Sequence, residues 1–325
     1  MSGELGVVMP FWLDRPDEEA VEIAQAAEQA GIDTAWIGEM ASFDAFALAT
    51  AIGLQTEHMG LKIGPLAVGV RTPVAIALGA ASVATLTGRP VDVALGASSP
   101  TIVSGWHDRS WTALAPRMRE TVLALRAILD GERIDVDGEL VRAHGFKLRR
   151  PQPGASVTVA AFGPAMTRVA ARHADEVVLN LVPVEHVAAV RARIDQEAAA
   201  AGRRAPRLAV WVAAALDPGA RAHAQLAGQV AVYLAAPGYG EMFSELGFAE
   251  LVEGARAGAR RSQLAAAMPA ELIATVGALG SAADVASRIA AYHDAGADQV
   301  AVVPSTAEDP AGRRVLGGLA RQGVA

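Results

Sequence analysis

The residues best suited to chemistry lie together in the segment "ALGASSPTIVSGWHDRSW" (94–111). Its apolar start passes into small polar residues, and Trp106 and His107 follow a few positions later. An imidazole titrates near neutrality, so His107 is the natural candidate for general acid–base catalysis. Trp106 and Trp111 could form an apolar wall beside it, or could pack the loop onto the protein. Because a lone histidine is more often structural, the segment alone identifies no reaction.

The middle of this segment suits the close approach of a ligand. Its side chains are minimal, so a flat molecule could lie against the main chain there, and Pro100 then turns the chain away. The residues concerned are Ala97, Ser98 and Ser99. The sequence therefore predicts a binding floor at this point.

Polar side chains also end two other apolar runs. Glu39 ends "WIGEM", where a site carboxylate and a solvated loop glutamate are equally supported. Asn180 ends "EVVLN" and suits either a ligand contact or a turn. Asp44 is at least as well suited to capping the start of a helix.

Two further segments could place backbone beside a ligand. Gly69 begins "GVRTPVAIA", where a flat ring could approach the main chain, although an ordinary turn with Thr72 as helix cap explains it as well. Phe162 begins "FGPAMTRVA", in which Gly-Pro opens a helix and leaves N–H groups for an anion. A structural helix start explains this second segment equally well.

Several reaction classes find no support in the chain. The sequence has no cysteine, and its seven histidines show no spacing such as HExxH, so we expect no metal site. No P-loop, no Ser/His/Asp order and no paired carboxylate spacing is present.

Composition narrows the partners. A net charge of −7, a pI near 5.5 and 52% hydrophobic residues argue for a small-molecule partner and against nucleic acid. The uncharged stretch 72–88 is short for a membrane span and contains Pro, Gly, Ser and Thr, so a buried helix is the better interpretation. "MSGELGVVMPF" does not resemble a signal peptide, and the absence of cysteine fits a reducing compartment. We therefore expect a cytoplasmic protein.

Short β-branched runs alternate with longer amphipathic patterns, which is typical of consecutive βα units. Eight units favour a closed (β/α)8 TIM barrel over an open sheet, which would carry a glycine-rich turn that "VMPFWLDRP" lacks. The predicted strands are Leu5–Phe11, Thr34–Gly38, Leu61–Ala67, Val91–Leu95, Val157–Ala161, Glu176–Leu181, Leu208–Ala213 and Gln299–Val303.

Two of the intervals between strands are long, which predicts insertions after strands 4 and 7. The first contains the segment 94–111 and then a hairpin pattern around Asp137-Gly138. The second, about 217–268, is helical with a break at "APGYGEMF". No linker composition separates the parts, so a single domain over 1–325 is expected.

The whole chain resembles the bacterial luciferase-like flavin monooxygenase superfamily, and within it the coenzyme F420-dependent oxidoreductases. The most specific likeness is small residues after the fourth strand followed by Pro-x-Ile-Val-x-Gly-Trp-His. Weaker likenesses follow in matching order: "WIGE", "FGPAMTRVAARHADEVVLN", "AAPGYGEMFSELGF" and "GSAADVASRIAAYHDAGADQVAVVP". The resemblance implies a (β/α)8 barrel with inserts, a cofactor at the carboxyl ends of the strands, and a homodimer.

The resemblance also implies particular cofactor contacts. In such proteins a non-prolyl cis peptide after the third strand backs the ring, and Gly69-Val70 is the matching pair here. Polar groups ending the second and fourth strands contact the ring or ribityl chain. The helix start after the fifth strand binds the phosphate side, and the end of the sixth strand lines the same channel. The implied positions are Glu39, Gly69, Val70, Ala97, Ser98, Ser99, Phe162, Gly163, Pro164, Ala165, Met166, Asn180 and Leu181.

Three departures from the family pattern bear on the reaction. In sugar-phosphate dehydrogenases of the family, a histidine assists hydride transfer, and Met40 occupies that position here. The glutamate that acts as an acid in those enzymes falls near Ser99. The basic residues that clamp a phosphate there are missing from "NLVPVEH". These differences argue against a sugar-phosphate substrate.

Three hypotheses follow. The first is an F420-dependent oxidoreductase that transfers a hydride between the deazaflavin and an unsaturated or alcohol-type small molecule, with a proton from His107, Glu39 or water. The second is an FMN-dependent monooxygenase using O2. A basic groove would favour F420, and Arg71 and Arg168 are its candidates. The third is a flavin-binding barrel without catalysis.

Overall fold

A computed structural model describes residues 3–39 and 41–323. Its contacts group into two compact units. Unit 1 comprises Met1–Ile32, Leu179–Ala189 and Val210–Ala325, and unit 2 comprises Asp33–Val178 and Val190–Ala209. The single domain expected over 1–325 stays a prediction.

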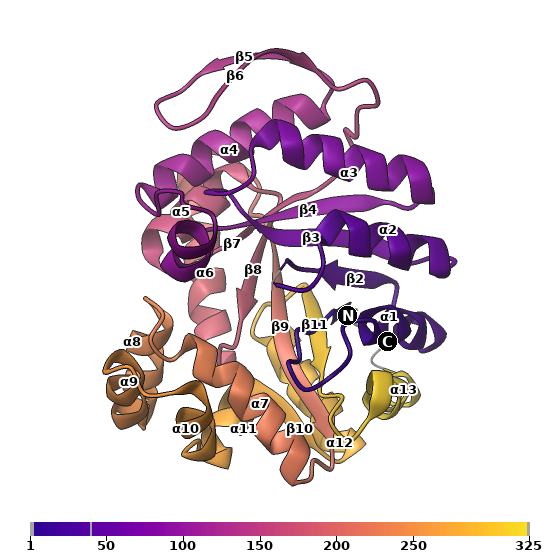
Figure 1. Cartoon of the computed structure of the whole chain (residues 1–325), viewed down its shortest axis with the longest axis vertical. Coiled ribbons are helices and arrows are strands. Elements are labelled where there is room, and N and C mark those ends of the chain that lie inside the picture. The colour runs from indigo at the N-terminus through magenta and orange to yellow at the C-terminus, as the bar shows by residue number, and fades with distance from the viewer. Residues whose placement is uncertain (1–2, 40, 324–325) are drawn as a thin grey trace. The chain divides into compact units, whose positions relative to one another are not determined.

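Unit 2 is built on a parallel sheet in the order β2-β3-β4-β7-β8, with each strand hydrogen-bonded to the next in register. Helices follow the strands along the chain, and Figure 1 shows α2 and α3 running beside β3 and β4. The elements are β2 (Thr34–Ile37), α2 (Ala45–Gln55), β3 (Gly60–Ala67), α3 (Pro73–Thr87), β4 (Val91–Gly96), the π-helical turn η1 (Thr101–Trp106), α4 (Leu114–Leu129), β5 (Arg133–Asp137), β6 (Arg142–Lys147), β7 (Val157–Ala160), α5 (Pro164–His173), β8 (Glu176–Asn180) and α6 (Val184–Ala200).

Local sequence explains where the first helices of unit 2 begin and end. The Thr72 side chain accepts a hydrogen bond from the Ala75 N–H and caps α3, which then starts with Pro73. Gly88 ends the same helix in the left-handed conformation, with φ +69°. The Asp44 carboxylate caps α2 in the same way. The caps suggested by the sequence are therefore present at both helices.

The third strand corrects one expectation from the resemblance. The described residues contain one cis peptide bond, which joins Gly64 to Pro65 and not Gly69 to Val70. The register between β3 and β4 shifts at the same place, between Ile63 and Leu66. Gly64 has φ +130°, and a Cβ there would lie 2.1 Å from the Ala94 carbonyl oxygen. The bulge therefore lies inside β3, where only glycine fits.

A hairpin of β5 and β6 packs beside α4, as the Asp137-Gly138 pattern predicted (Figure 1). The Glu120 carboxylate of α4 accepts hydrogen bonds from the N–H groups of Leu140 (2.9 Å) and Val141 (2.8 Å). These contacts anchor the turn of the hairpin to the helix.

Unit 1 carries strands in the order β10-β9-β11-β1, and both pairs with assigned register are parallel. Its buried core includes Val7, Val302 and Tyr292. The elements are β1 (Glu4–Val8), α1 (Glu19–Gln29), β9 (Arg207–Leu216), α7 (Ala220–Tyr233), α8 (Tyr239–Phe243), the π-helical turn η2 (Ser244–Phe248), α9 (Ala249–Arg256), α10 (Arg261–Ala266), α11 (Ala270–Val276), β10 (Gly277–Gly280), α12 (Ala282–Asp294), β11 (Gln299–Pro304), the 3₁₀ turn η3 (Pro310–Gly312) and α13 (Arg313–Arg321).

All eight predicted strands are present, as β1, β2, β3, β4, β7, β8, β9 and β11. The first is shorter than predicted, because β1 ends at Val8 and Pro10 follows it. Among the described helices, none is long and apolar enough to cross a membrane.

Candidate active site

The segments that follow β3 and β4 in unit 2 are joined to each other. The Val68 N–H donates to the Gly96 carbonyl oxygen at 3.1 Å. A Cβ on Gly69 would lie 2.9 Å from the Val103 side chain, so the turn after β3 packs directly against η1. The structure thus brings together Gly69 and the segment that the sequence singled out.

The predicted binding floor has an unusual backbone. Ser98 adopts φ +58°, a left-handed conformation that costs a non-glycine residue of the order of 1 kcal/mol. The Ser99 hydroxyl accepts from the Ile102 N–H at 3.4 Å, at the start of η1. The Trp111 indole N–H donates to the Ala97 carbonyl oxygen at 3.0 Å and holds the segment from its far end. Strained residues and π-helical turns both concentrate at functional sites.

His107 and Trp106 lie at the end of η1 and are exposed to solvent. Trp106 is 52% exposed. The His107 N–H donates to the Ile102 carbonyl oxygen, and no described residue hydrogen-bonds the imidazole ring. An exposed ring without a structural partner is compatible with the catalytic role predicted for His107, which stays a prediction.

Glu39 is tied into an ion cluster after β2 and β3. The Arg71 guanidinium donates to both oxygens of Glu39, through Nε at 2.9 Å and through Nη2, and also to Asp44. Burial raises the pKa of Asp44, but the hydrogen bonds from Arg71 and from the Ala47 N–H outweigh it and lower that pKa below its ordinary value. Arg71 therefore joins the loops after β2 and β3 through Glu39 and Asp44. The catalytic role predicted for Glu39 stays a prediction.

The start of α5 presents unsatisfied N–H groups. Gly163 precedes Pro164 at the start of this helix and supplies no side-chain cap, and nothing lies within 4 Å of a Cβ built on it. Gly163, Pro164 and Ala165 are exposed. A helix start that is open and lacks a side-chain cap fits the phosphate of a flavin or deazaflavin cofactor.

The two arginines considered for a basic groove are both paired. Arg168 donates to Glu197 at 3.0 Å, and Glu197 also accepts from Arg172. Arg71 is held by Glu39 and Asp44, as described above. The described residues therefore show no free cation at either of these two positions.

A buried ion pair inside unit 2 was not predicted. Lys62 Nζ lies 2.5 Å from Glu176 Oε2, and Thr158 Oγ1 donates to the same oxygen at 2.9 Å. Lys62 also lies over the Trp36 ring, 4.7 Å from its centre. Lys62 and Thr158 are polar residues inside otherwise apolar strands, and Glu176 begins another, which is the signal that the sequence offers.

Asp92 lies beside this pair, opposite Lys62 in the register of β3 and β4. Its Oδ1 accepts from the Ser156 N–H at 2.7 Å. Burial raises the pKa of Asp92 above its ordinary value, against the opposing effects of that hydrogen bond and of Lys62.

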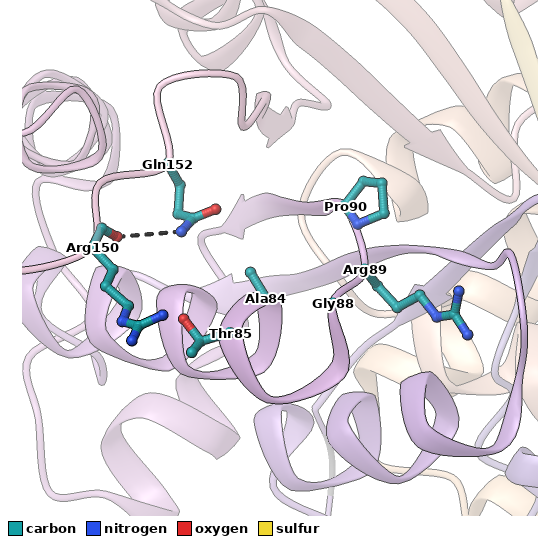
Figure 2. A pocket seen from close by; sticks show the side chains of 7 residues that line it. All are labelled: Ala84, Thr85, Gly88, Arg89, Pro90, Arg150 and Gln152. Atoms are coloured by element: carbon teal, nitrogen blue, oxygen red, sulfur yellow. Dashed lines mark hydrogen bonds between the residues drawn. The ribbon is translucent and has the colours of Figure 1, made fainter.

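A pocket of about 370 Å³ opens at the amino end of β4 (Figure 2). Two of its polar side chains already have partners: Arg89 donates to the carbonyl oxygens of Gly53 and Thr56, and the Gln152 amide donates to the Arg150 carbonyl oxygen at 3.2 Å. Active sites of α/β barrels lie at the carboxyl ends of strands. We therefore do not assign this pocket as the active site. It is lined by Ala84, Thr85, Gly88, Arg89, Pro90, Arg150 and Gln152.

Two predicted residues, Asn180 and Leu181, lie in unit 1, whereas Val70, Phe162 and Met166 belong to unit 2. Asn180 is the last residue of β8, and Leu181 follows with φ +50° and is buried. Burial raises the pKa of Tyr233 and of Tyr239, against a smaller opposing effect of the Asn180 side chain, and the two tyrosine ring centres are 4.9 Å apart. Both tyrosines were missed, although Tyr239 lies in the quoted "APGYGEMF".

Met40, where relatives carry a catalytic histidine, lies outside the described residues. Among the described residues, no group of three histidine, aspartate or glutamate side chains could hold a metal ion.

Comparison with known proteins decides the family. The model of the luciferase-like monooxygenases matches residues 10–299. The chain belongs to this family.

Relatives in the luciferase-like family include F420-dependent enzymes. A coenzyme F420-dependent oxidoreductase of Mycobacterium tuberculosis is 24% identical in an alignment 337 positions long. The alignment covers 94% of this chain and 96% of that protein. The structure of the coenzyme F420-dependent tetrahydromethanopterin reductase of Methanopyrus kandleri matches with a TM-score of 0.80 and 16% identity, over 99% of this chain and 98% of that chain. F420-dependent oxidoreductases are the enzyme class that the resemblance implied.

The family also includes an FMN-bound neighbour. The oxygenating constituent of 3,6-diketocamphane monooxygenase of Pseudomonas putida, a structure in complex with FMN, matches with a TM-score of 0.71 and 18% identity, over 99% of this chain and 98% of that chain. Together these structures confirm the predicted (β/α)8 barrel fold of the luciferase-like family.

Proposed function

We propose that the chain is an F420-dependent oxidoreductase that transfers a hydride between the deazaflavin and a small organic substrate of alcohol or unsaturated type. The observation that carries this proposal is the open start of α5, at Gly163, together with the small-residue segment after β4. The F420-dependent relatives support the choice of cofactor.

The residues of unit 2 would hold the cofactor in distinct ways. The N–H groups of Ala165 and Met166 would bind its phosphate, since no side chain caps that helix. Ala97, Ser98 and Ser99 would receive the flat ring or its chain against the backbone. When bound, the deazaflavin would supply the carbon that accepts or gives the hydride.

The role of this chain is then mainly orientation. The contact of Gly69 with Val103 and the hydrogen bond from Trp111 to Ala97 fix the segment after β4. Fixed positioning of two reacting carbons at about 3 to 3.5 Å accounts for a large share of enzymatic rate acceleration. We propose His107 as the proton carrier of the site, and Glu39 as the residue that positions Arg71 and the loops after β2 and β3.

Cofactor titration tests the proposal. F420 should bind with micromolar affinity, and the bound cofactor should quench the fluorescence of Trp106 or Trp111. FMN should bind at least about tenfold more weakly. Binding of neither cofactor would refute both enzymatic hypotheses.

Paired serine replacements test the location. Ser98→Leu with Ser99→Leu places bulk on the predicted floor, and we expect F420 affinity to fall at least about 30-fold, or 2 kcal/mol. Ala192→Leu, at an exposed position of α6, is the control and should leave the affinity unchanged. Equal affinities of the two variants would show that the cofactor lies elsewhere.

One observation favours the second candidate, an FMN-dependent monooxygenase. A basic groove would favour F420, whose tail is acidic, but its two candidates, Arg71 and Arg168, are both paired with carboxylates. FMN has no such tail. Tight binding of FMN with weak binding of F420 would decide for the monooxygenase.

We also propose a homodimer. The helices α2 and α3 contain no charged residue, and Leu54, Leu78 and Leu86 on them are 65%, 47% and 65% exposed. A helix that is apolar all round is normally covered. Sedimentation should give a dimer for the natural chain and a monomer for Leu78→Glu with Leu86→Glu; a natural chain that sediments as a monomer would refute this.

The absence of cysteine supports the cytoplasm as the proposed location.

A further inference from the structure

The pocket at the amino end of β4 contains a cation that no described residue neutralises. The carbonyl oxygen of Arg150 accepts from the Gln152 amide, but its guanidinium makes no hydrogen bond or ion pair within the described part of the chain. The other cation, Arg89, is held by the carbonyl oxygens of Gly53 and Thr56. Figure 2 shows its guanidinium pointing away from Arg150. Arg150 is therefore available to a ligand of this pocket.

A hydroxyl group that lines the same pocket is also available. Ser82 and Thr87 of α3 each donate to the carbonyl oxygen four residues earlier, at 2.7 Å. Thr85, on the same helix, donates to no described residue, so its hydroxyl is free to bind an oxygen atom. Figure 2 shows the side chain of Arg150 extending toward Thr85. Two donors thus line one pocket.

The charges around the pocket define the ligand. Among the described residues that line it, none is acidic, so no carboxylate of the lining competes for Arg150. The last turn of α3, before Gly88, presents carbonyl groups and the negative end of the helix dipole. These groups repel a second negative charge, and a single free guanidinium balances one. A monoanion therefore fits the pocket better than a dianion.

The pocket has room for more than an ionic group. Its volume is about 370 Å³, and Ala84 and Pro90 supply an apolar part of its lining. An arginine binds a carboxylate through two parallel N–H···O bonds. A small organic acid can therefore place its carboxylate on Arg150 and its hydrocarbon part against Ala84 and Pro90.

We propose that this pocket binds the carboxylate of a small organic acid through Arg150 and Thr85. The six residues of β4 separate it from the candidate active site, a span of roughly 20 Å. Leu78 and Leu86, which we propose for the dimer contact, do not line it. The proposal therefore adds a second ligand site to unit 2, and it does not depend on the proposed cofactor or reaction.

Binding of benzoate and benzamide tests the proposal, because the two molecules have nearly the same shape and only benzoate is charged. Ligand-observed NMR at constant ionic strength should give a Kd on the order of 1 mM for benzoate, and benzamide should bind at least about tenfold more weakly. Arg150→Gln should reduce benzoate binding to the level of benzamide, and Thr85→Val should weaken it about threefold. Undetectable binding of benzoate, or equal affinities of the two molecules, would overturn the proposal.

Arg149→Gln is the matched control. Arg149 is exposed and does not line the pocket, so this change alters the net charge equally and should leave the benzoate affinity unchanged. An equal loss in both arginine variants would show only general attraction to a basic surface and would refute the site.

Two further measurements locate the ligand and fix its class. Benzoate should bind the Ser98→Leu, Ser99→Leu variant as tightly as the natural chain, and a loss there would place it in the candidate active site instead. Phenyl phosphate carries a second charge and should bind no more tightly than benzoate. Tighter binding of phenyl phosphate would overturn the assignment to a carboxylate.

Discussion

Unit 2 contains two clusters of opposite charges, at opposite ends of its strands. Lys62 and Glu176, in the amino-terminal halves of their strands, have side chains only 11% and 1% exposed. Arg71 and Asp44, beyond the carboxyl ends, are 21% and 48% exposed. Where water is excluded, charges must satisfy one another and so contribute to folding; where water reaches them, they can fix loops around a ligand at little cost. Ion pairs thus stabilise the fold at one end of the strands and position the loops of the candidate site at the other.

Breaking the buried cluster should have the largest effect. Glu176→Gln leaves Lys62 charged and buried without its partner, so we expect the free energy of unfolding to fall by about 3–5 kcal/mol, measured by urea denaturation. Replacing both residues, Lys62→Met with Glu176→Leu, should recover most of that loss. The exposed pair of Asp137 and Arg142 is the control, and Asp137→Asn should cost under about 1 kcal/mol. If Glu176→Gln lowered the free energy of unfolding as little as Asp137→Asn does, the buried cluster would contribute no more to folding than an exposed pair.

Breaking the exposed cluster should cost less and depend on salt and pH. We expect Arg71→Met to lower the free energy of unfolding by about 1–2 kcal/mol at pH 7 and low salt. Because the pKa of Asp44 is lowered in the folded state, this contribution is present above its ordinary value of about 3.9 and is lost as pH falls through the folded value.

Urea denaturation at pH 7 and pH 3, and in 1 M NaCl, checks this prediction. The difference between Arg71→Met and the natural chain should shrink in acid and in salt, whereas the cost of Glu176→Gln should persist in salt. A difference that is unchanged in salt would mean that water and ions reach the Arg71 cluster as little as they reach the Lys62–Glu176 pair.

The smallest effect is expected at Asp92, on the edge of the buried cluster. Its pKa is raised in the folded state by burial, so the folded state holds the proton more tightly. Stability therefore falls as pH rises from below the unfolded pKa to above the folded one. Asp92→Asn keeps the acceptor for the Ser156 N–H and should raise the melting temperature at pH 7 by an amount on the order of 2 °C, with no gain at low pH. A lower melting temperature at pH 7 would show that attraction to Lys62 outweighs burial.

Periodicity predicted the strands because each is a short apolar run between helical patterns. All eight are present, and the likeness to luciferase-like structures confirms the barrel. Local rules also predicted the caps at Asp44 and Thr72, since a cap depends on residues only a few positions apart.

Contacts between distant residues could not be predicted in this way. Lys62 and Glu176 are 114 positions apart, and a charged residue in an apolar strand does not name its partner. The turn before Tyr239 requires glycine at 238 and 240, which composition alone does not reveal. The cis peptide was placed at Gly69-Val70 by likeness, whereas it joins Gly64 to Pro65, where the β3 register shifts. The catalytic role of His107 stays a prediction.

All three tyrosines of the chain lie in unit 1, and burial raises the pKa of each, that of Tyr292 to about 12. An ordinary tyrosine ionises near pH 10. The folded protein should therefore show almost no phenolate absorbance at pH 10.5. Since unit 2 contributes no phenol, any ultraviolet signal of this kind would report the opening of unit 1 alone, so alkaline spectroscopy can follow one half of the molecule without a label.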